Sequence, residues 1–395
     1  MVTNYYGMYQ RLEEYVRKSS GDQPQRTEPV QHMLDLLQAP YNALRNYDQF
    51  LAALRQQVTP EEAEVWCVYP DYTLTVSAKT PDEVLEDVRP GLRTRLAELS
   101  QSMARKGFLL EDTTPSGQTG YIRTYFYEIA SRLIYHPDGT SLAEAFLHWW
   151  IDVVDGGDSA KLRESYPEYR VLPHEGALTG DSRHGKIPMN LEIPDTREIL
   201  PDIDFAETLL KKCRRYAVTD CICRVAKDMD HSRPCSFPVK DVCLMFDAVA
   251  DGGIASGDAR EISREEALQI IRRCRDLGMV QIISNAEHPL CVCNCCKCCC
   301  ACLRSMERFE DTVGEASRYV AEAAHSDACV HCGKCQKVCP VEAVDISGAY
   351  TYVQAQRCIG CGVCVSQCPK GVLKLSKRPG AIDHVAQKDL DRVYI

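Results

Sequence analysis

The sequence predicts an α+β chain built from several domains. Three observations carry this prediction. The first 150 residues read as amphipathic helical segments with one strand–turn–strand stretch, 16 of the 23 cysteines fall between residues 291 and 368, and one cysteine spacing occurs twice near the end. A chain of 395 residues with 45% hydrophobic and 26% charged residues is globular in composition and long enough for two or three domains.

Residues 1–58 are predicted to form a helical segment. The stretch "VQHMLDLLQAPYNALRNYDQFLAALRQQV" has apolar residues at spacings of three and four, and Pro40 divides it into two helices. The N-terminus lacks the basic-then-apolar order of a signal peptide, and no run of about 18 apolar residues occurs. We therefore expect a cytoplasmic protein without direct membrane insertion.

Residues 59–135 have the order helix, helix, helix, hairpin. Thr59 and Thr80 each precede a proline and acidic residues, as helix caps do, and Gly107 ends the third helix. "FLLEDTTPSGQTGYIRTY" then reads as strand, turn, strand. This order is typical of a winged helix, so we predict a winged-helix-like domain.

Such a domain either binds DNA or docks on a protein. DNA would be contacted by Arg93, Arg95, Arg105 and Lys106. The preceding helix is acidic, with Asp82, Glu83, Glu86 and Asp87, and the net charge of the chain is −10. Because nucleic-acid binding depends on phosphate neutralisation, we favour docking on a protein and expect nucleic acid not to be the partner.

Residues 136–201 are predicted to hold a helical piece and then a linker, because prolines and glycines recur without periodicity. Its histidines, His174 and His184, are expected to be solvated. Residues 202–310 form a first cysteine-rich domain, residues 325–376 a second, and residues 377–395 a tail. The isolated Cys67, Cys213 and Cys274 are expected to be structural thiols.

The firmest signal lies in the second cysteine-rich domain. "CVHCGKCQKVCP" and "CIGCGVCVSQCP" both have the spacing C-x2-C-x2-C-x3-C-P. Zinc is the alternative for an isolated C-x2-C pair, but three-cysteine runs closed by Cys-Pro favour iron–sulfur clusters. Over about fifty residues this domain resembles the bacterial two-cluster ferredoxin module.

That resemblance implies two [4Fe–4S] clusters with crossed ligands. One would be held by Cys329, Cys332, Cys335 and Cys368, and the other by Cys358, Cys361, Cys364 and Cys339. The ferredoxin-like module as a whole is not strongly acidic. This balance of charge fits a module built into an assembly better than a freely diffusing one.

The first cysteine-rich domain has two groups of thiols. "DCICRVAKDMDHSRPCSFPVKDVCL" carries Cys221, Cys223, Cys235 and Cys243, and "CVCNCCKCCCAC" carries Cys291, Cys293, Cys295, Cys296, Cys298, Cys299, Cys300 and Cys302. Consecutive cysteines face different directions, so the second stretch is predicted to lie between two metal sites completed by the first group. One or two further iron–sulfur clusters are expected, whose type stays open; spare thiols or a sulfur- or metal-handling loop are the alternatives.

Most of residues 59–375 also resemble a family of anaerobe iron–sulfur proteins. Members combine a winged-helix-like front, a "CICR" stretch, a "CNCCxCCC" stretch and a two-cluster ferredoxin tail, and this chain has "AVTDCICR" and "CNCCKCCC". Cys291 and Cys302 depart from the family pattern, which leaves their role as ligands open. The density of easily oxidised thiols also indicates a reducing, anaerobic setting.

The leading hypothesis is a multi-cluster electron-transfer protein that relays low-potential electrons to or from a partner oxidoreductase. One alternative is a reductase with a substrate-binding cluster in residues 221–302, where Arg224 would steer an anion or offset cluster charge. The other is a redox-sensing regulator that binds DNA through the winged helix. No nucleotide-binding motif and no catalytic triad can be identified. Catalytic residues, donor, acceptor and oligomeric state are not predicted.

Overall fold

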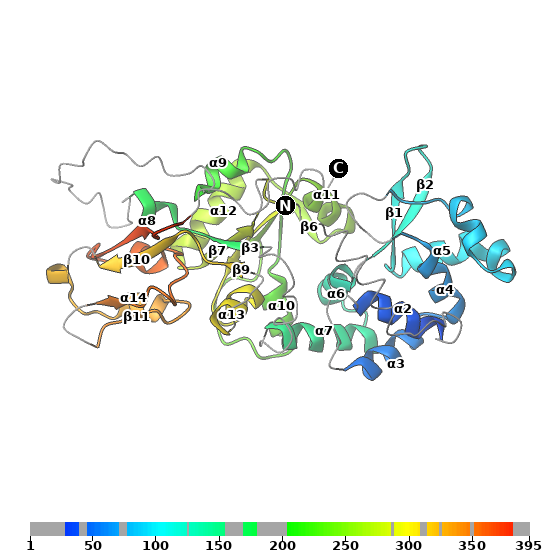
Figure 1. The fold of residues 1–395 in the computed structure, drawn as a ribbon, viewed down its shortest axis with the longest axis horizontal. Helices are drawn as coiled ribbons and strands as arrows, with labels where there is room; N and C mark the ends of the chain where they lie inside the picture. Colours follow the sequence, from blue (N-terminus) through cyan, green and yellow to red (C-terminus); the bar gives the residue numbers. More distant parts are fainter. Residues whose placement is uncertain are drawn as a thin grey trace. The chain divides into compact units, whose positions relative to one another are not determined.

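The computed structural model describes residues 28–38, 46–70, 77–124, 126–154, 169–179, 204–285, 288–308, 314–323, 326–347 and 351–381. The chain divides into two compact units, unit 1 within residues 1–152 and unit 2 within residues 153–391 (Figure 1). Helices and strands occur in both, as expected of an α+β chain. No helix in the described part of the chain is long and apolar enough to span a membrane.

Unit 1 is mainly helical. Its elements are α2 (Pro29–Gln38), α3 (Tyr47–Gln57), α4 (Pro60–Val68), the 3-10 helices η2 (Asp82–Asp87) and η3 (Pro90–Arg95), α5 (Leu96–Arg105), the strands β1 (Leu109–Thr113) and β2 (Thr119–Arg123), α6 (Phe126–Tyr135) and α7 (Ser141–Val154). Strands β1 and β2 form an antiparallel hairpin. Pro40, the predicted helix break, lies outside the described residues.

Both predicted threonine caps are present in unit 1. The Thr59 hydroxyl accepts the Glu62 N–H while the Glu62 carboxylate accepts the Thr59 N–H, a reciprocal capping box. Thr80 and Glu83 repeat the arrangement, but the turn that follows is the 3-10 helix η2 rather than an α-helix. Pro90 explains the interruption, because Arg89 before it adopts an extended ψ of 144°.

Helix α4 packs against the hairpin and α5. The Trp66 indole donates a hydrogen bond of 2.8 Å to the Phe108 carbonyl, and the hydroxyls of Tyr69 and Ser100 lie 2.7 Å apart. Arg123 of β2 stacks over the Trp66 ring at 4.8 Å. The helices and hairpin between residues 59 and 123 therefore share one buried core.

Unit 2 is built on a seven-stranded sheet with strand order β6-β4-β5-β8-β7-β3-β9. The strands are β3 (Tyr169–Leu172), β4 (Tyr216–Thr219), β5 (Cys243–Phe246), β6 (Ala259–Glu261), β7 (Val280–Ser284), β8 (Cys291–Cys295) and β9 (Gly314–Glu315). All neighbours are antiparallel except β3 and β9. The helices of this part are α8 (Glu175–Thr179), α9 (Ala206–Leu210), α10 (Ile222–Met229), α11 (Asp247–Ser256), α12 (Arg264–Asp276) and α13 (Ala301–Arg308).

The two faces of the sheet bury different partners. Alternate residues such as Leu172, Ile283 and Val292 lie in one buried cluster with α9 and α12. The residues between them, Val171 and Ile282 among others, lie in a second cluster. Helix α12 begins with the predicted Ser263 cap, whose hydroxyl accepts the Glu266 N–H, and a left-handed Gly278 follows it.

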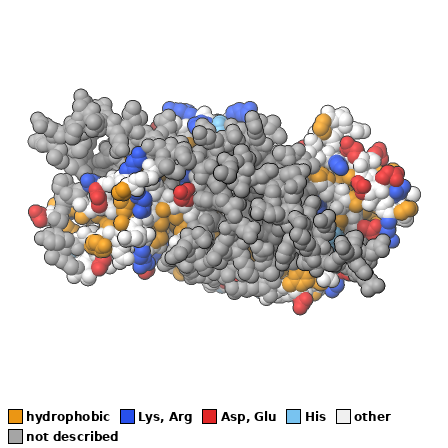
Figure 2. Space-filling view, in the orientation of Figure 1, with side chains coloured by type: hydrophobic (Ala, Val, Ile, Leu, Met, Phe, Trp, Pro, Cys, Tyr) orange, Lys and Arg blue, Asp and Glu red, His pale blue; other side chains and the backbone are white. Residues whose placement is uncertain are grey.

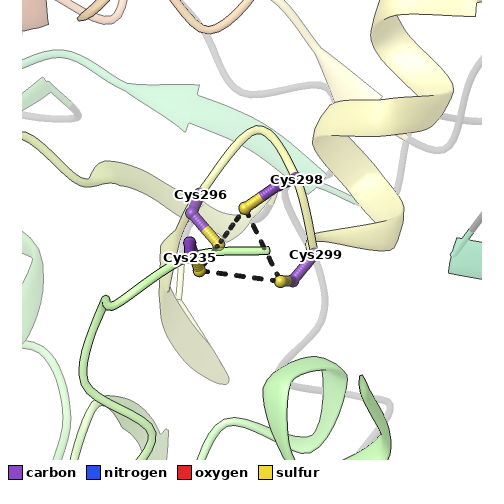
Figure 3. A group of neighbouring side chains, drawn as sticks. All are labelled: Cys235, Cys296, Cys298 and Cys299. Carbon is purple, nitrogen blue, oxygen red and sulfur yellow. Dashed lines mark hydrogen bonds between the residues drawn. The ribbon is translucent and has the colours of Figure 1, made fainter. Parts of the chain in front are cut away.

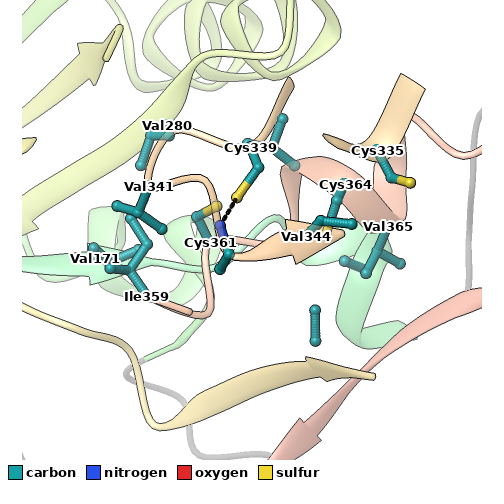
Figure 4. Packing of buried hydrophobic residues seen from close by; sticks show 14 of the residues in the cluster. Val171, Val280, Cys335, Cys339, Val341, Val344, Ile359, Cys361, Cys364 and Val365 are labelled. Carbon is teal, nitrogen blue, oxygen red and sulfur yellow. Dashed lines mark hydrogen bonds between the residues drawn. The ribbon is translucent and has the colours of Figure 1, made fainter. Parts of the chain in front are cut away.

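The second face of the sheet is covered by residues 319–377, here called the C-terminal segment. It contains β10 (Tyr319–Ala323), the 3-10 helix η6 (Ser326–Ala328), α14 (Lys334–Val338), β11 (Val344–Asp345), β12 (Tyr352–Val353), α15 (Val363–Ser366) and β13 (Leu373–Lys377). Strands β10 and β13 pair, as do β11 and β12. Figure 4 shows Val171 and Val280 of the sheet near Val341, Ile359 and Cys361 of this segment.

The two predicted cysteine-rich domains therefore share one hydrophobic core. Cys295, Cys300 and Leu303 belong to the same buried cluster as Cys335, Cys361 and Cys364. Separate domains were expected because each stretch has its own cysteine pattern. The sheet face and the C-terminal segment instead bury one another.

Part of the predicted linker is a strand of the central sheet. β3 pairs with β7, whose residues lie more than 100 positions later in the sequence. The expectation that His174 is solvated is wrong: it is 1% exposed, and its ring nitrogens lie 3.0 Å from the Ser366 hydroxyl and 2.9 Å from the Met279 carbonyl. Its backbone N–H donates to the Cys361 carbonyl. His174 thus joins the sheet to α15, whereas His184 lies outside the described residues.

Candidate metal centres

The C-terminal segment holds the two sets of four thiols that the resemblance to a two-cluster ferredoxin implies. We call Cys339, Cys358, Cys361 and Cys364 the inner set, and Cys329, Cys332, Cys335 and Cys368 the outer set. The inner set lines one pocket together with apolar residues of β10, β11 and the loops between them: Ala321, Val341, Ala343, Val344 and Ile359. Four thiols around an apolar pocket fit an iron–sulfur cluster, which needs ligands and exclusion of water.

Backbone N–H groups point at sulfur atoms of the inner set. Ala321 N–H donates to the Cys358 sulfur at 3.4 Å, and Ala343 N–H donates to the Cys339 sulfur at 3.2 Å. Such bonds stabilise the negative charge of metal-bound thiolates. Burial raises the pKa of Cys361 to about 12, so this thiol keeps its proton at neutral pH unless a metal replaces it.

The outer set crosses between the two motifs. Coulombic interactions couple Cys335 to Cys368 and to Cys329, and burial, the larger effect, raises the pKa of Cys335. Cys368 of the second motif therefore lies near thiols of the first. The outer set is also nearer to solvent, because Cys332 is exposed and Cys329 is half-buried, whereas Cys339, Cys361 and Cys364 are buried.

A second kind of thiol group lies where the sheet leads into α13. Cys296, Cys298 and Cys299 occupy the turn after β8, and Cys235 reaches them from the loop after α10 (Figure 3). The four sulfur atoms all lie within 4.8 Å of one another, with separations of 3.6, 3.6, 3.8 and 3.9 Å for four of the pairs. We call these cysteines the four-thiol group.

Arg224 lies beside the four-thiol group and is 1% exposed. Its Nη1 donates to the Cys296 sulfur at 3.4 Å, its Nη2 donates to the Asn294 carbonyl at 3.0 Å, and none of the described carboxylates forms an ion pair with it. Burial alone would lower the pKa of Arg224, but the sulfurs of Cys221, Cys296 and Cys243 raise it. A buried cation requires a negative partner, so this guanidinium indicates anionic, metal-bound sulfur on its neighbours.

The remaining thiols of the first cysteine-rich stretch lie on strands β5 and β8 and at the starts of helices α10 and α13. Cys243 of β5 is the direct partner of Cys293 on β8, and Cys291 and Cys295 flank Cys293 on the same face. The sulfurs of Cys300 and Cys295 lie 3.1 Å apart. We call the whole group the sheet-face thiols: Cys221, Cys223, Cys243, Cys291, Cys293, Cys295, Cys300 and Cys302.

Hydrogen bonds between thiols hold this group together. Hydrogen bonds with Cys223 and Cys243 lower the pKa of the Cys221 thiol. The hydrogen bond with Cys293 raises the pKa of the Cys291 thiol. Coulombic interactions extend the group to Cys300 and Cys302. A run of neighbouring thiols that donate and accept among themselves would become a ligand set when metal displaces the protons.

The sequence prediction and the structure differ in how these thiols are divided. Cys235 was grouped with Cys221, Cys223 and Cys243, but the structure places it with the turn at residues 296–299. Cys291, left open as a ligand, lies among the sheet-face thiols, and an i, i+2, i+4 pattern of Cys291, Cys293 and Cys295 is the signal that indicates it. Cys213 and Cys274 are buried in the core beside α9 and α12, in the cluster that also contains Cys221, and Cys274 interacts electrostatically with Cys221.

Comparison with known proteins bears on one part of the chain. Residues 321–369 match the family of 4Fe-4S dicluster domains, and this range contains all eight thiols of the inner and outer sets. No curated protein and no solved structure matches the chain. The chain therefore carries an iron–sulfur dicluster domain, packed on a sheet whose strands β5 and β8 carry further thiols.

Proposed function

We propose that this protein relays low-potential electrons between a partner oxidoreductase and a further iron–sulfur cluster held by the sheet-face thiols. The observation that carries the proposal is the shared core. Cys295 and Cys300 of the sheet-face thiols lie in the same buried cluster as thiols of the inner and outer sets. Centres that share one packed interior are close enough to exchange electrons without leaving the protein.

The solvent exposure of the thiol sets supports a path for electrons through the relay. Cys332 of the outer set is exposed, and beside this set Val330 is 57% and Tyr352 is 61% exposed. Exposed large apolar side chains next to a redox centre suit contact with a partner protein. Electrons would enter or leave at the outer set, pass to the buried inner set, and reach the sheet-face thiols.

Unit 1 supplies a second surface for a partner. Three of the four basic side chains considered for DNA contact are paired with acidic neighbours: Arg93 pairs with Glu86, Arg95 with Glu61 and Lys106 with Glu62. Figure 2 shows acidic and basic side chains next to one another on the visible face of this unit. This pairing leaves little positive charge for DNA phosphates and favours protein docking over the regulator hypothesis.

The electron capacity of the chain tests the proposal. Each [4Fe–4S] cluster takes up one electron, so a dicluster domain alone accepts two. Anaerobic coulometric titration should give more than two electrons per wild-type chain. The double variant Cys295→Ala/Cys300→Ala should accept two, while Cys213→Ala, at a buried thiol that donates to the Leu209 and Pro289 carbonyls, should behave as wild type. A wild-type capacity of two would refute the relay.

A reductase is the second candidate, because eight sheet-face thiols exceed the four that one cubane needs and permit an unusual cluster. Arg224 gives it no support, since this side chain is buried and bonded to Cys296 and Asn294 rather than open to an anionic substrate. Rapid reoxidation of the isolated, reduced protein by one substrate, lost in the same double variant, would favour the enzyme over the relay.

A further inference from the structure

We propose that the four-thiol group, Cys235, Cys296, Cys298 and Cys299, holds a single zinc ion and not an iron–sulfur cluster. This inference does not rest on the proposed function, because zinc carries no electrons. It assigns one of the expected metal sites of the first cysteine-rich stretch to a structural ion.

The spacing of the sulfur atoms carries the proposal. Zinc bound to four thiolates at about 2.3 Å in a tetrahedron sets neighbouring sulfurs about 3.8 Å apart. The measured separations are 3.6, 3.6, 3.8 and 3.9 Å. In a [4Fe–4S] cubane each thiolate binds a different iron, which spreads the four sulfurs to roughly 6 Å. The four-thiol group is too compact for a cubane and has the size of a single-ion site.

The dicluster domain provides an internal comparison. Among the described residues, the four-thiol group is the one set of three or more potential ligands whose atoms all lie within 4.8 Å of one another. The inner and outer sets, at positions matched by a 4Fe-4S family, are spread more widely. The four-thiol group is thus more compact than the two ligand sets of the dicluster domain.

The surroundings fit a charged, closed site. Zinc with four thiolates has a net charge of −2, and the buried guanidinium of Arg224, 3.4 Å from the Cys296 sulfur, offsets part of it. The Nε of Arg224 has no hydrogen-bond partner among the described residues, and the charged groups that raise its pKa are the sulfurs of Cys221, Cys296 and Cys243. Zinc is preferred over iron because it binds thiolate sites more tightly and accepts a tetrahedral arrangement of four ligands.

The site also has a structural task. Residues 232–239 contain no helix or strand, and Arg233 shapes them by donating to the carbonyls of Cys235 and Phe237 at 2.8 and 3.1 Å. An ion shared by Cys235 and the turn at residues 296–299 fastens this irregular segment to the end of β8. Four protein ligands with no open position are typical of structural zinc.

Metal analysis of the full chain tests the assignment. Protein expressed with iron in excess and purified anaerobically should contain about one zinc per chain in addition to iron, and X-ray absorption at the zinc edge should show four sulfurs at about 2.3 Å. Cys298→Ser, at the half-buried position of the group, should lose at least tenfold in zinc and keep its iron and sulfide. Cys332→Ser, in the outer set, should lose iron and keep zinc.

The outcomes separate this inference from the relay. Loss of iron and sulfide in Cys298→Ser with zinc retained would mean that the group binds a cluster, and the proposal would be wrong. Wild-type protein without zinc, or with the visible bands of one ferric ion in four thiolates that vanish in Cys298→Ser, would overturn it as well. If Cys298→Ser fails to fold, the wild-type absorption spectrum still decides. Zinc present in a chain that lacks cluster iron would uphold the zinc site and refute the relay.

Discussion

Replacing Gly360 by alanine tests how tightly the cluster-binding loop of the dicluster domain packs against β10. Gly360 lies between Cys358 and Cys361, and its φ is +66°, in the left-handed region. A Cβ there would lie 2.9 Å from the carbonyl carbon of Tyr319, and closer still to the Tyr319 oxygen and the Ser317 hydroxyl. Ordinary contact begins at 3.4 Å, so the Tyr319 carbonyl would have to retreat by at least about 0.5 Å. Tyr319 is held in β10 by its pairing with β13.

The free-energy cost of Gly360→Ala is the sum of three contributions. The left-handed conformation costs a non-glycine residue about 1–2 kcal/mol. Overpacking against a fixed strand adds about 1–3 kcal/mol. The bonds from Ser317 N–H to Ile359 and from its hydroxyl to Gly360, 3.0 and 2.9 Å, are worth about 1 kcal/mol each. Together they reach roughly 4–7 kcal/mol, a large part of the stability of an ordinary domain.

Gly380→Ala is the matched control. Gly380 has nearly the same backbone, with φ at +74°, but a Cβ there would meet nothing within 4 Å. Its cost is the conformational strain alone, about 1–2 kcal/mol. The difference between the two variants isolates the contact between the cluster loop and β10.

Iron content and cluster lifetime are the readouts. The Gly360→Ala protein should lose the cluster of the inner set, about four irons per chain, and its remaining absorbance should bleach in anaerobic guanidinium at least tenfold faster than that of Gly380→Ala. Equal iron content and equal bleaching rates would refute the reasoning, since the loop would then tolerate a side chain that the structure has no room for.

Three further variants test other parts of the chain. Cys329→Ala and Cys368→Ala should each remove the same reduced-state EPR signal, because Cys368 lies with Cys335 and Cys329; loss of different signals would exclude crossed ligation. Glu62→Gln should lower the free energy of unfolding of unit 1 by about 1–2 kcal/mol at pH 7. Burial alone would raise the pKa of Glu62, but hydrogen bonds from Lys106, Thr59 and Ser102 lower it, so this contribution disappears as the pH falls through the folded-state pKa. Urea unfolding should therefore show the two proteins converging in acid, and a constant difference would contradict the assignment. Arg224→Met should cost about 3–5 kcal/mol of metal binding, measured as zinc transfer to a chelator at least a hundredfold faster than in wild type; unchanged transfer would show that Arg224 carries no compensating charge.

Local signals were enough for several features of the fold. Thr59 and Thr80 were predicted as caps from their own residue type and the acidic residues that follow, and both hydroxyls accept the expected N–H. The C-x2-C-x2-C-x3-C-P repeat is also local, and its match to a 4Fe-4S dicluster family bears out the iron–sulfur prediction. Such features depend on contacts within one helical turn or one loop.

Features that depend on distant parts of the chain were missed. β3 has four residues, too few for a periodic pattern, and its partner β7 begins at Val280. His174 is buried because β3 places it against Ser366 and Met279, 192 and 105 positions away. Cys235 meets Cys296 across 61 positions, so spacing along the chain assigned it to its nearer neighbours. Sequence spacing reports a ligand set only where one loop supplies most of it.

The run of consecutive cysteines has a simple physical explanation in this arrangement. At Cys295–Cys296 the chain passes from a strand whose alternate side chains face the C-terminal segment into a turn that faces Cys235. At Cys299–Cys300 it passes back, since Cys299 belongs to the four-thiol group and Cys300 meets Cys295. Two of the three adjacent pairs, Cys295–Cys296 and Cys299–Cys300, therefore mark crossings between two sites, whereas Cys298 and Cys299 serve the same one. Arg224 is coupled to thiols of both sites, to Cys296 on one side and to Cys221 and Cys243 on the other. A redox-inert ion at the four-thiol group would thus fix the charge beside the sheet-face cluster without competing for its electrons.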